Sequence, residues 1–117
     1  MGTSYVEFRK HGFWARDSIL SGWLRTLIDE IRAGAPSTDW LRALIRHCEM
    51  QSEIDGGCMD LELDSFLADD ERRRYVISAA DSALSGSSEA SKRTVILFLA
   101  LLKGEVKTDA SSPIDYL

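Results

Sequence analysis

The stretch DSILSGWLRTLIDEIRAG, residues 17–34, carries the clearest structural signal in the chain. Its large apolar residues follow one another at steps of one, three and four, which places them on a single stripe of an α-helix. They are Ile19, Leu20, Trp23, Leu24, Leu27, Ile28 and Ile31. Asp17 and Ser18 are suitable capping residues, and Gly34 followed by Pro36 ends the helix. We therefore predict an amphipathic helix that buries this stripe.

A second helix is predicted to follow almost at once. Ser37, Thr38 and Asp39 offer a cap, and the same apolar spacing then repeats until the pattern fades near residues 51–53. The apolar positions are Trp40, Leu41, Leu44, Ile45 and Cys48. Because few residues separate the two helices, we expect them to form an antiparallel pair.

Two more helices are predicted in the second half. One has the acidic residues 69–71 at its start, because negative charge stabilises a helix N-terminus, and it carries a thin stripe of mostly alanine. The other runs from about Glu89 to Lys103, with Gly104 as its stop. Its segment VILFLALL, residues 95–102, is apolar on all sides, so this helix is either central to the bundle or shared with a second subunit. Because the third helix offers mostly alanine as cover, we predict a homodimer through this last helix. A buried strand is the competing interpretation, which the leucine and alanine content disfavours.

The flanking segments are predicted to be irregular. Residues 1–16 fit an irregular or short extended segment, in which residues 5–8 form a short strand and residues 11–14 turn into the first helix. Residues 105–117 are expected to form an irregular tail. The predicted fold is therefore all-α, a single helical domain over residues 1–117. It is a bundle of about four main helices with an irregular acidic connection between the second and third.

The composition is that of an ordinary globular domain, with 117 residues, 44% of them hydrophobic and 28% charged. No apolar run approaches the about 20 residues that span a bilayer, and the first residues lack a signal-peptide pattern. We therefore expect a cytoplasmic protein in which Cys48 and Cys58 are free thiols. The net charge of −5 argues against nucleic acid or an anionic membrane as the partner.

Patterns of catalytic and metal-binding residues are missing from the sequence. His47 and Cys48 are adjacent, so on a helix they point about 100° apart and cannot easily share one ion. The acids from Asp55 onward do not have the spacing of a calcium loop. The chain also lacks the Gly-x-Ser-x-Gly elbow of hydrolases and the glycine-rich loop that binds phosphates. We therefore predict no enzyme activity, no metal and no cofactor.

Acidic residues are concentrated in one stretch of the chain. Eight acids and no base lie between Glu53 and Glu71, namely Glu53, Asp55, Asp60, Glu62, Asp64, Asp69, Asp70 and Glu71. One interpretation is a solvated loop that aids solubility. The other is a surface that pairs with arginines and lysines of a partner and speeds its capture. The apolar residues interleaved with the acids would either contact that partner or hold the loop on the bundle.

We predict that the chain is a non-catalytic protein-binding protein with a basic protein as its partner. The expected partner-binding residues are Asp55, Asp60, Glu62, Asp64 and Trp14, the last of which fits a core or an interface position equally. In physical type, carried by size and charge alone, the chain resembles small acidic inhibitor or immunity proteins that neutralise a basic toxin enzyme. The alternatives are a structural or regulatory subunit that dimerises through the last helix, and a small enzyme with a site of carboxylates and His47.

Overall fold

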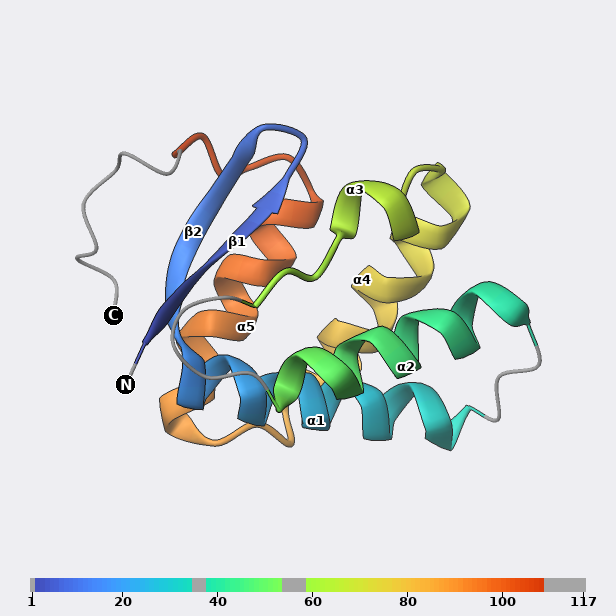
Figure 1. Cartoon of the computed structure of the whole chain (residues 1–117), viewed down its shortest axis with the longest axis horizontal. Coiled ribbons are helices and arrows are strands. Elements are labelled where there is room, and N and C mark those ends of the chain that lie inside the picture. Colours follow the sequence, from blue (N-terminus) through green and yellow to red (C-terminus); the bar gives the residue numbers. More distant parts are fainter. Residues whose placement is uncertain (1, 35–37, 54–58, 109–117) are drawn as a thin grey trace.

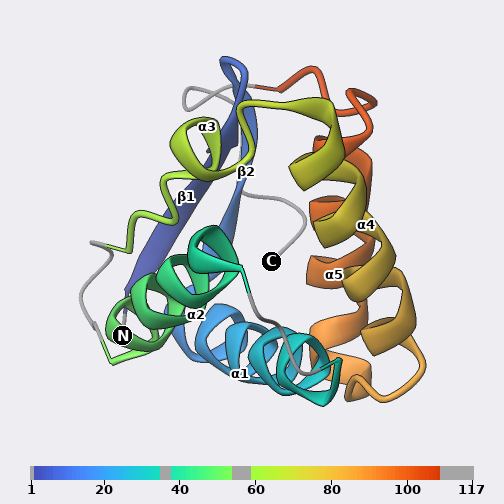
Figure 2. The ribbon, with the colours of Figure 1, turned by 90° about the vertical axis from the view of Figure 1, so that its right-hand side faces the viewer.

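The computed structural model describes residues 2–34, 38–53 and 59–108, and it is mostly helical with a small two-stranded sheet (Figure 1). In chain order the elements are β1 (Thr3–Phe8), β2 (His11–Arg16), α1 (Asp17–Ala33), α2 (Asp39–Ser52), α3 (Leu63–Phe66), α4 (Asp70–Leu84) and α5 (Glu89–Leu102). Figure 2 shows α1 and α2 side by side at the base, with the hairpin and α5 rising from them. The four predicted helices are confirmed as α1, α2, α4 and α5.

The ends of the helices lie close to the predicted ones. The side chain of Asp69 accepts a hydrogen bond from the Arg72 N–H at 2.8 Å, which caps α4 as expected. Ser21 near the start of α1 donates to the carbonyl oxygen of Ser52 at the end of α2 at 2.8 Å, so the two helices are antiparallel. The start of α1 differs from the prediction, because the helix begins at Asp17 and no side chain caps it.

The N-terminal residues form an antiparallel β-hairpin, so the all-α prediction is wrong at this end of the chain. The predicted strand at residues 5–8 is confirmed within β1, but residues 11–14 continue as a strand instead of turning into the helix. The turn explains the error. Arg9 and Lys10 have φ angles of 51° and 72°, the left-handed conformation of a two-residue hairpin turn that an Asn-Gly pair normally signals.

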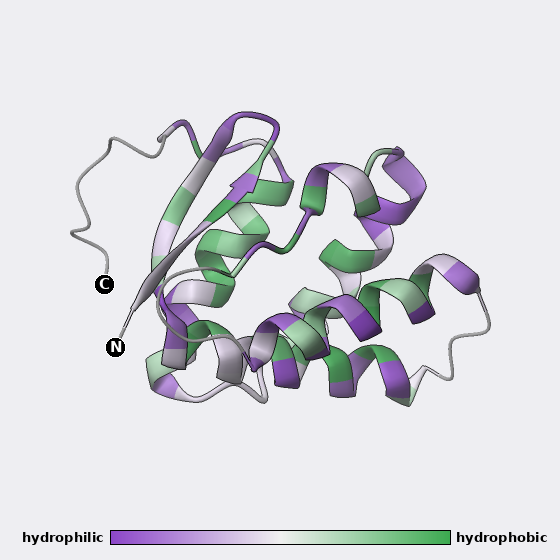
Figure 3. Ribbon diagram, in the orientation of Figure 1, coloured by the Kyte–Doolittle hydropathy of each residue, from purple (hydrophilic) through white to green (hydrophobic). Residues whose placement is uncertain are grey.

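The hairpin covers one side of α5 and thereby completes the core. Trp23 of α1 is 0% exposed, and its ring lies edge-on to Phe98 of α5 with centroids 5.7 Å apart. Of the apolar residues 95–102, Ile96 is exposed (56%), while the rest are buried or half-buried. Figure 3 shows the last turns of α5 as hydrophobic ribbon behind the hairpin. A dimer was considered because this apolar segment needs to be covered on all sides. The chain itself covers most of it.

The segment after α5 returns to the hairpin. Residues 105–108 have no regular secondary structure, as predicted for the start of the tail, and residues 109–117 lie outside the described residues. The Gly12 N–H of β2 donates to the Thr108 carbonyl oxygen at 3.0 Å, and the Thr108 hydroxyl donates to the Gly12 carbonyl oxygen at 2.5 Å. Among the described residues, no helix has the length and apolar character needed to cross a membrane.

Candidate functional site

The acidic connection between α2 and α4 contains an ordered segment, residues 59–65, which we call the acidic arm. Its side chains alternate as predicted from the sequence. Met59, Leu61 and Leu63 are buried, whereas Asp60, Glu62 and Asp64 are exposed. The arm is irregular as far as Glu62, and its last residues form the start of α3. The apolar residues hold the arm on the bundle and leave the three acidic residues exposed.

Hydrogen bonds fasten the arm to the hairpin at both of its ends. The Met59 N–H donates to the hydroxyl of Ser4, a fully buried residue of β1, at 3.2 Å. At the other end, the backbone N–H of Arg9 in the hairpin turn donates to the carboxylate of Asp64 at 2.9 Å. The arm is therefore held beside β1 by polar contacts as well as by apolar burial.

Two side chains of α2 hold the middle of the arm. The Nε2 atom of His47 lies 2.6 Å from the carbonyl oxygen of Asp60 and 3.2 Å from the carboxylate of Glu62. Gln51, one turn further along α2, accepts the Asp60 N–H at 2.7 Å. The imidazole also lies against Phe66 of α3, with ring centroids 5.4 Å apart. His47 is thus a contact between α2 and the arm.

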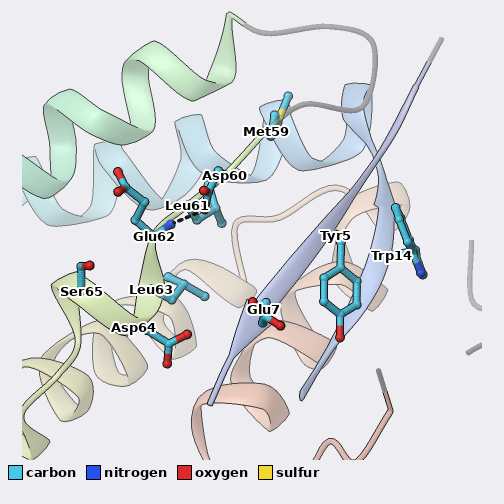
Figure 4. Close-up of a pocket in the computed structure, with 10 residues that line it drawn as sticks. All are labelled: Tyr5, Glu7, Trp14, Met59, Asp60, Leu61, Glu62, Leu63, Asp64 and Ser65. Atoms are coloured by element: carbon cyan, nitrogen blue, oxygen red, sulfur yellow. Dashed lines mark hydrogen bonds between the residues drawn. The ribbon is translucent and has the colours of Figure 1, made fainter. Parts of the chain in front are cut away.

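A pocket of about 410 Å³ lies between the acidic arm and the hairpin (Figure 4). The hairpin contributes Tyr5, Glu7 and Trp14, and the arm contributes all of residues 59–65. Tyr5 and Trp14 are opposite each other in the strand register, and their ring centroids are 5.2 Å apart. Four of the lining residues are acidic (Glu7, Asp60, Glu62 and Asp64), and none of the described lining residues is basic.

The pocket brings together four of the five predicted partner-binding residues, namely Asp60, Glu62, Asp64 and Trp14. The fifth, Asp55, lies outside the described residues. Sequence reasoning missed Tyr5 and Glu7, which alternate with the buried residues of β1 and therefore point to its outer face. Continuing that alternation across the hairpin would have placed both beside Trp14.

Each carboxylate of the arm also has a partner within the chain. Asp60 accepts the Glu62 N–H at 3.0 Å, Asp64 accepts the Arg9 N–H, and Glu62 pairs with His47. Each of these contacts uses one carboxylate oxygen, and an ionised carboxylate has about four acceptor sites. The acids are therefore held in place and keep the capacity to bind incoming donors.

The thiol of Cys48 faces the core and takes no part in the pocket. It is a free cysteine, as predicted, whereas Cys58 lies outside the described residues. Burial, assisted by the nearby charge of Glu49, raises the pKa of the Cys48 thiol to about 12. The thiol is therefore neutral at physiological pH, and the neutral form is a poor nucleophile.

Neither a cluster of metal-binding side chains nor similarity to known proteins points to a function. In the described part of the chain, no three His, Cys, Asp or Glu side chains gather closely enough to hold a metal ion. Comparisons of the chain with family models, curated proteins and solved structures find no match. A functional assignment therefore depends on the pocket and on the charges that line it.

Proposed function

We propose that the chain is a non-catalytic protein-binding domain, whose pocket between the acidic arm and the hairpin receives a basic segment of a partner protein. One observation carries the proposal: four acidic residues and the Tyr5–Trp14 ring pair line one pocket, and none of the described residues in that lining is basic. An arginine guanidinium pairs with carboxylates and also stacks on aromatic rings. Both kinds of contact are available here in one place.

The proposal fits an acidic inhibitor or immunity-type protein that neutralises a basic toxin enzyme. In such a protein, outward-facing carboxylates on a rigid support enter a site that is built to bind anionic substrate groups. The net charge of −5 would speed the encounter with a basic partner. We place this function in the cytoplasm, a reducing compartment in which the Cys48 thiol would persist.

The two alternative functions have less support from the geometry. A small enzyme would need His47 as a base, but its Nε2 atom lies 2.6 Å from a carbonyl oxygen and donates a hydrogen bond there, so this nitrogen is not available as a base. A dimer through α5 would need an uncovered apolar face, and the hairpin, α1 and α4 pack against that helix. Protein binding through the pocket needs neither condition.

A hexa-arginine peptide is a suitable probe for the proposed function. We would measure its affinity by calorimetry at about 50 mM and about 200 mM salt, because screening weakens charge pairing. The pocket variant replaces its four acids by amides (Glu7→Gln, Asp60→Asn, Glu62→Gln and Asp64→Asn). The control variant makes the same number of replacements at exposed acids outside the pocket (Asp29→Asn, Glu71→Gln, Asp81→Asn and Glu105→Gln).

The two variants have the same net charge and differ only in where the charges were removed. We expect the pocket variant to lose most of the affinity and of the salt dependence, and the control variant to keep most of both. Equal losses in the two variants would mean that the peptide responds to overall charge. That result would overturn the proposal.

A further inference from the structure

The imidazole of His47 connects the backbone of the acidic arm to one of the pocket carboxylates. Its Nε2 atom lies 2.6 Å from the Asp60 carbonyl oxygen, which can only accept, so this nitrogen carries a hydrogen. The same atom lies 3.2 Å from the carboxylate of Glu62. The His47 side chain is 17% exposed and that of Glu62 is 50% exposed, so the pair lies at the edge of solvent.

The acidic arm, α3 and α2 surround the imidazole of His47, and they differ in the charged groups that they bring near it. From the arm, Glu62 is the one carboxylate within ion-pair distance among the described residues, since the carboxylate of Asp60 is turned to the Glu62 N–H. From α3, Phe66 presents an uncharged ring. On α2 itself, Arg46 and Glu49 flank His47 in sequence and are exposed. The charge state of His47 therefore acts mainly on Glu62.

We propose that His47 positions the acidic arm and that a proton on His47 competes with the partner's cation for Glu62. This inference rests on the proposed function. The neutral ring donates to the Asp60 carbonyl and leaves the charge of Glu62 available to the partner. The protonated ring places a positive charge 3.2 Å from Glu62 and neutralises part of the pocket's field. The competition makes the pocket pH-sensitive.

The sign of the pH dependence follows from this competition. A partner that takes Glu62 removes a stabilising neighbour from the imidazolium, so binding releases protons from His47. By reciprocity, adding protons weakens partner binding. Affinity should therefore fall as the pH is lowered through about 8 to 5, the range in which histidine side chains change charge.

The chain contains two histidines, which allows a matched test. We would measure hexa-arginine affinity at about pH 8 and about pH 5.5 for the wild type, His47→Gln and His11→Gln. Glutamine keeps a donor for the Asp60 carbonyl but cannot become charged, and His11 lies outside the pocket lining. We expect the wild-type Kd to rise roughly three- to fivefold at the lower pH, as for one exposed ion pair. His11→Gln should keep this rise, and His47→Gln should lose it.

The possible failures are distinguishable. If the wild type and His47→Gln show the same pH dependence, the inference is overturned and the proposed function stands. If the wild type does not bind the peptide at either pH, the proposed function is overturned.

Discussion

The hydroxyl of Ser4 donates a 2.5 Å hydrogen bond to the carboxylate of Asp17, and both residues are buried. Asp17 is the first residue of α1, where the helix dipole stabilises negative charge. The Ser4 oxygen also accepts the Met59 N–H at the start of the acidic arm. One buried side chain thus joins β1, α1 and the arm, so the stability of the fold and the position of the arm depend on the same contact.

Replacing Ser4 by alanine should lower the free energy of unfolding by about 2 kcal/mol. The substitution removes a donor from a carboxylate that is 4% exposed and an acceptor from a buried N–H. Chemical denaturation measures the change. Ser18→Ala is the matched control. Ser18 is an exposed residue of α1, the helix that Asp17 begins, and its replacement should change stability by less than about 0.5 kcal/mol. Equal values for the two variants would contradict the structural role of Ser4.

Glycine at position 10 of the hairpin turn should make the protein more stable than the lysine that is there. Lys10 has a φ of 72°, a conformation that costs a residue with a Cβ roughly 1 kcal/mol relative to glycine. Lys10→Gly should therefore raise the free energy of unfolding by about that amount, measured by thermal unfolding. Lys10→Ala is the control, because it removes the lysine side chain and keeps the unfavourable φ. A gain with alanine as large as that with glycine would contradict this account.

The Cys48 thiol predicts a stability change in alkaline solution. Burial raises its pKa from 9.0 to about 12, so between these values the unfolded thiol ionises while the folded one stays neutral. The thiol's contribution to stability is therefore complete below about pH 9 and is lost as the pH rises toward 12. In a Cys58→Ser background, the stability difference between Cys48 and Cys48→Ala should shift in favour of alanine above pH 9. A constant difference across that range would contradict the raised pKa.

The same burial predicts how slowly the thiol reacts. In the Cys58→Ser background, Cys48 is the one remaining cysteine. Only the thiolate is nucleophilic, so iodoacetamide at about pH 8 should label the folded protein far more slowly than the unfolded protein. Mass spectrometry with and without denaturant measures both rates. Similar rates would mean that the side chain is accessible in the folded state.

The helices could be predicted because their signals are local. The last helix was expected from Glu89 to Lys103, and α5 spans Glu89–Leu102, capped by the Ser88 side chain and followed by Gly104 with a φ of 79°. The second strand could not be predicted in the same way. Gly12 was interpreted as part of a turn, whereas it is a strand residue over which the ring of Tyr5 lies. A Cβ at Gly12 would overlap the Val6 carbonyl oxygen and come within 2.8 Å of that ring.

In the candidate site, too, the residues with a local sequence signal were predicted and those that depend on tertiary contacts were not. The acids of the arm were predicted from their charge and from the apolar residues interleaved with them, both of which are visible in a few neighbouring residues. Glu7 and Tyr5 were not predicted, because their role depends on a meeting between segments more than 50 residues apart. Charge and alternation identify the wall formed by the arm. Of the hairpin wall only Trp14 was predicted, and the tertiary structure supplies Tyr5 and Glu7.

Tryptophan fluorescence should report where a basic peptide binds. The chain has three tryptophans. Trp23 is fully buried and Trp14 lines the pocket. Trp40 is on α2 and faces α4, with its ring centroid 5.8 Å from that of Tyr75. A guanidinium that enters the pocket will contact the Trp14 ring and change its emission. We therefore expect hexa-arginine to change the fluorescence of the wild type and of Trp40→Phe, and to leave that of Trp14→Phe nearly unchanged.

The affinity measured alongside separates a lost signal from lost binding. Phenylalanine keeps an aromatic ring at position 14, so Trp14→Phe should bind hexa-arginine within about tenfold of the wild type even though its emission does not respond to the peptide. The opposite pattern, in which the response survives in Trp14→Phe and disappears in Trp40→Phe, has a specific meaning. It would place the peptide in the hollow between α2 and α4, which Trp40, Asp69 and Glu71 line and where the Arg72 guanidinium already lies over the Trp40 ring. The acidic arm would then be a structural connection, and partner recognition would belong to the other end of the same acidic stretch.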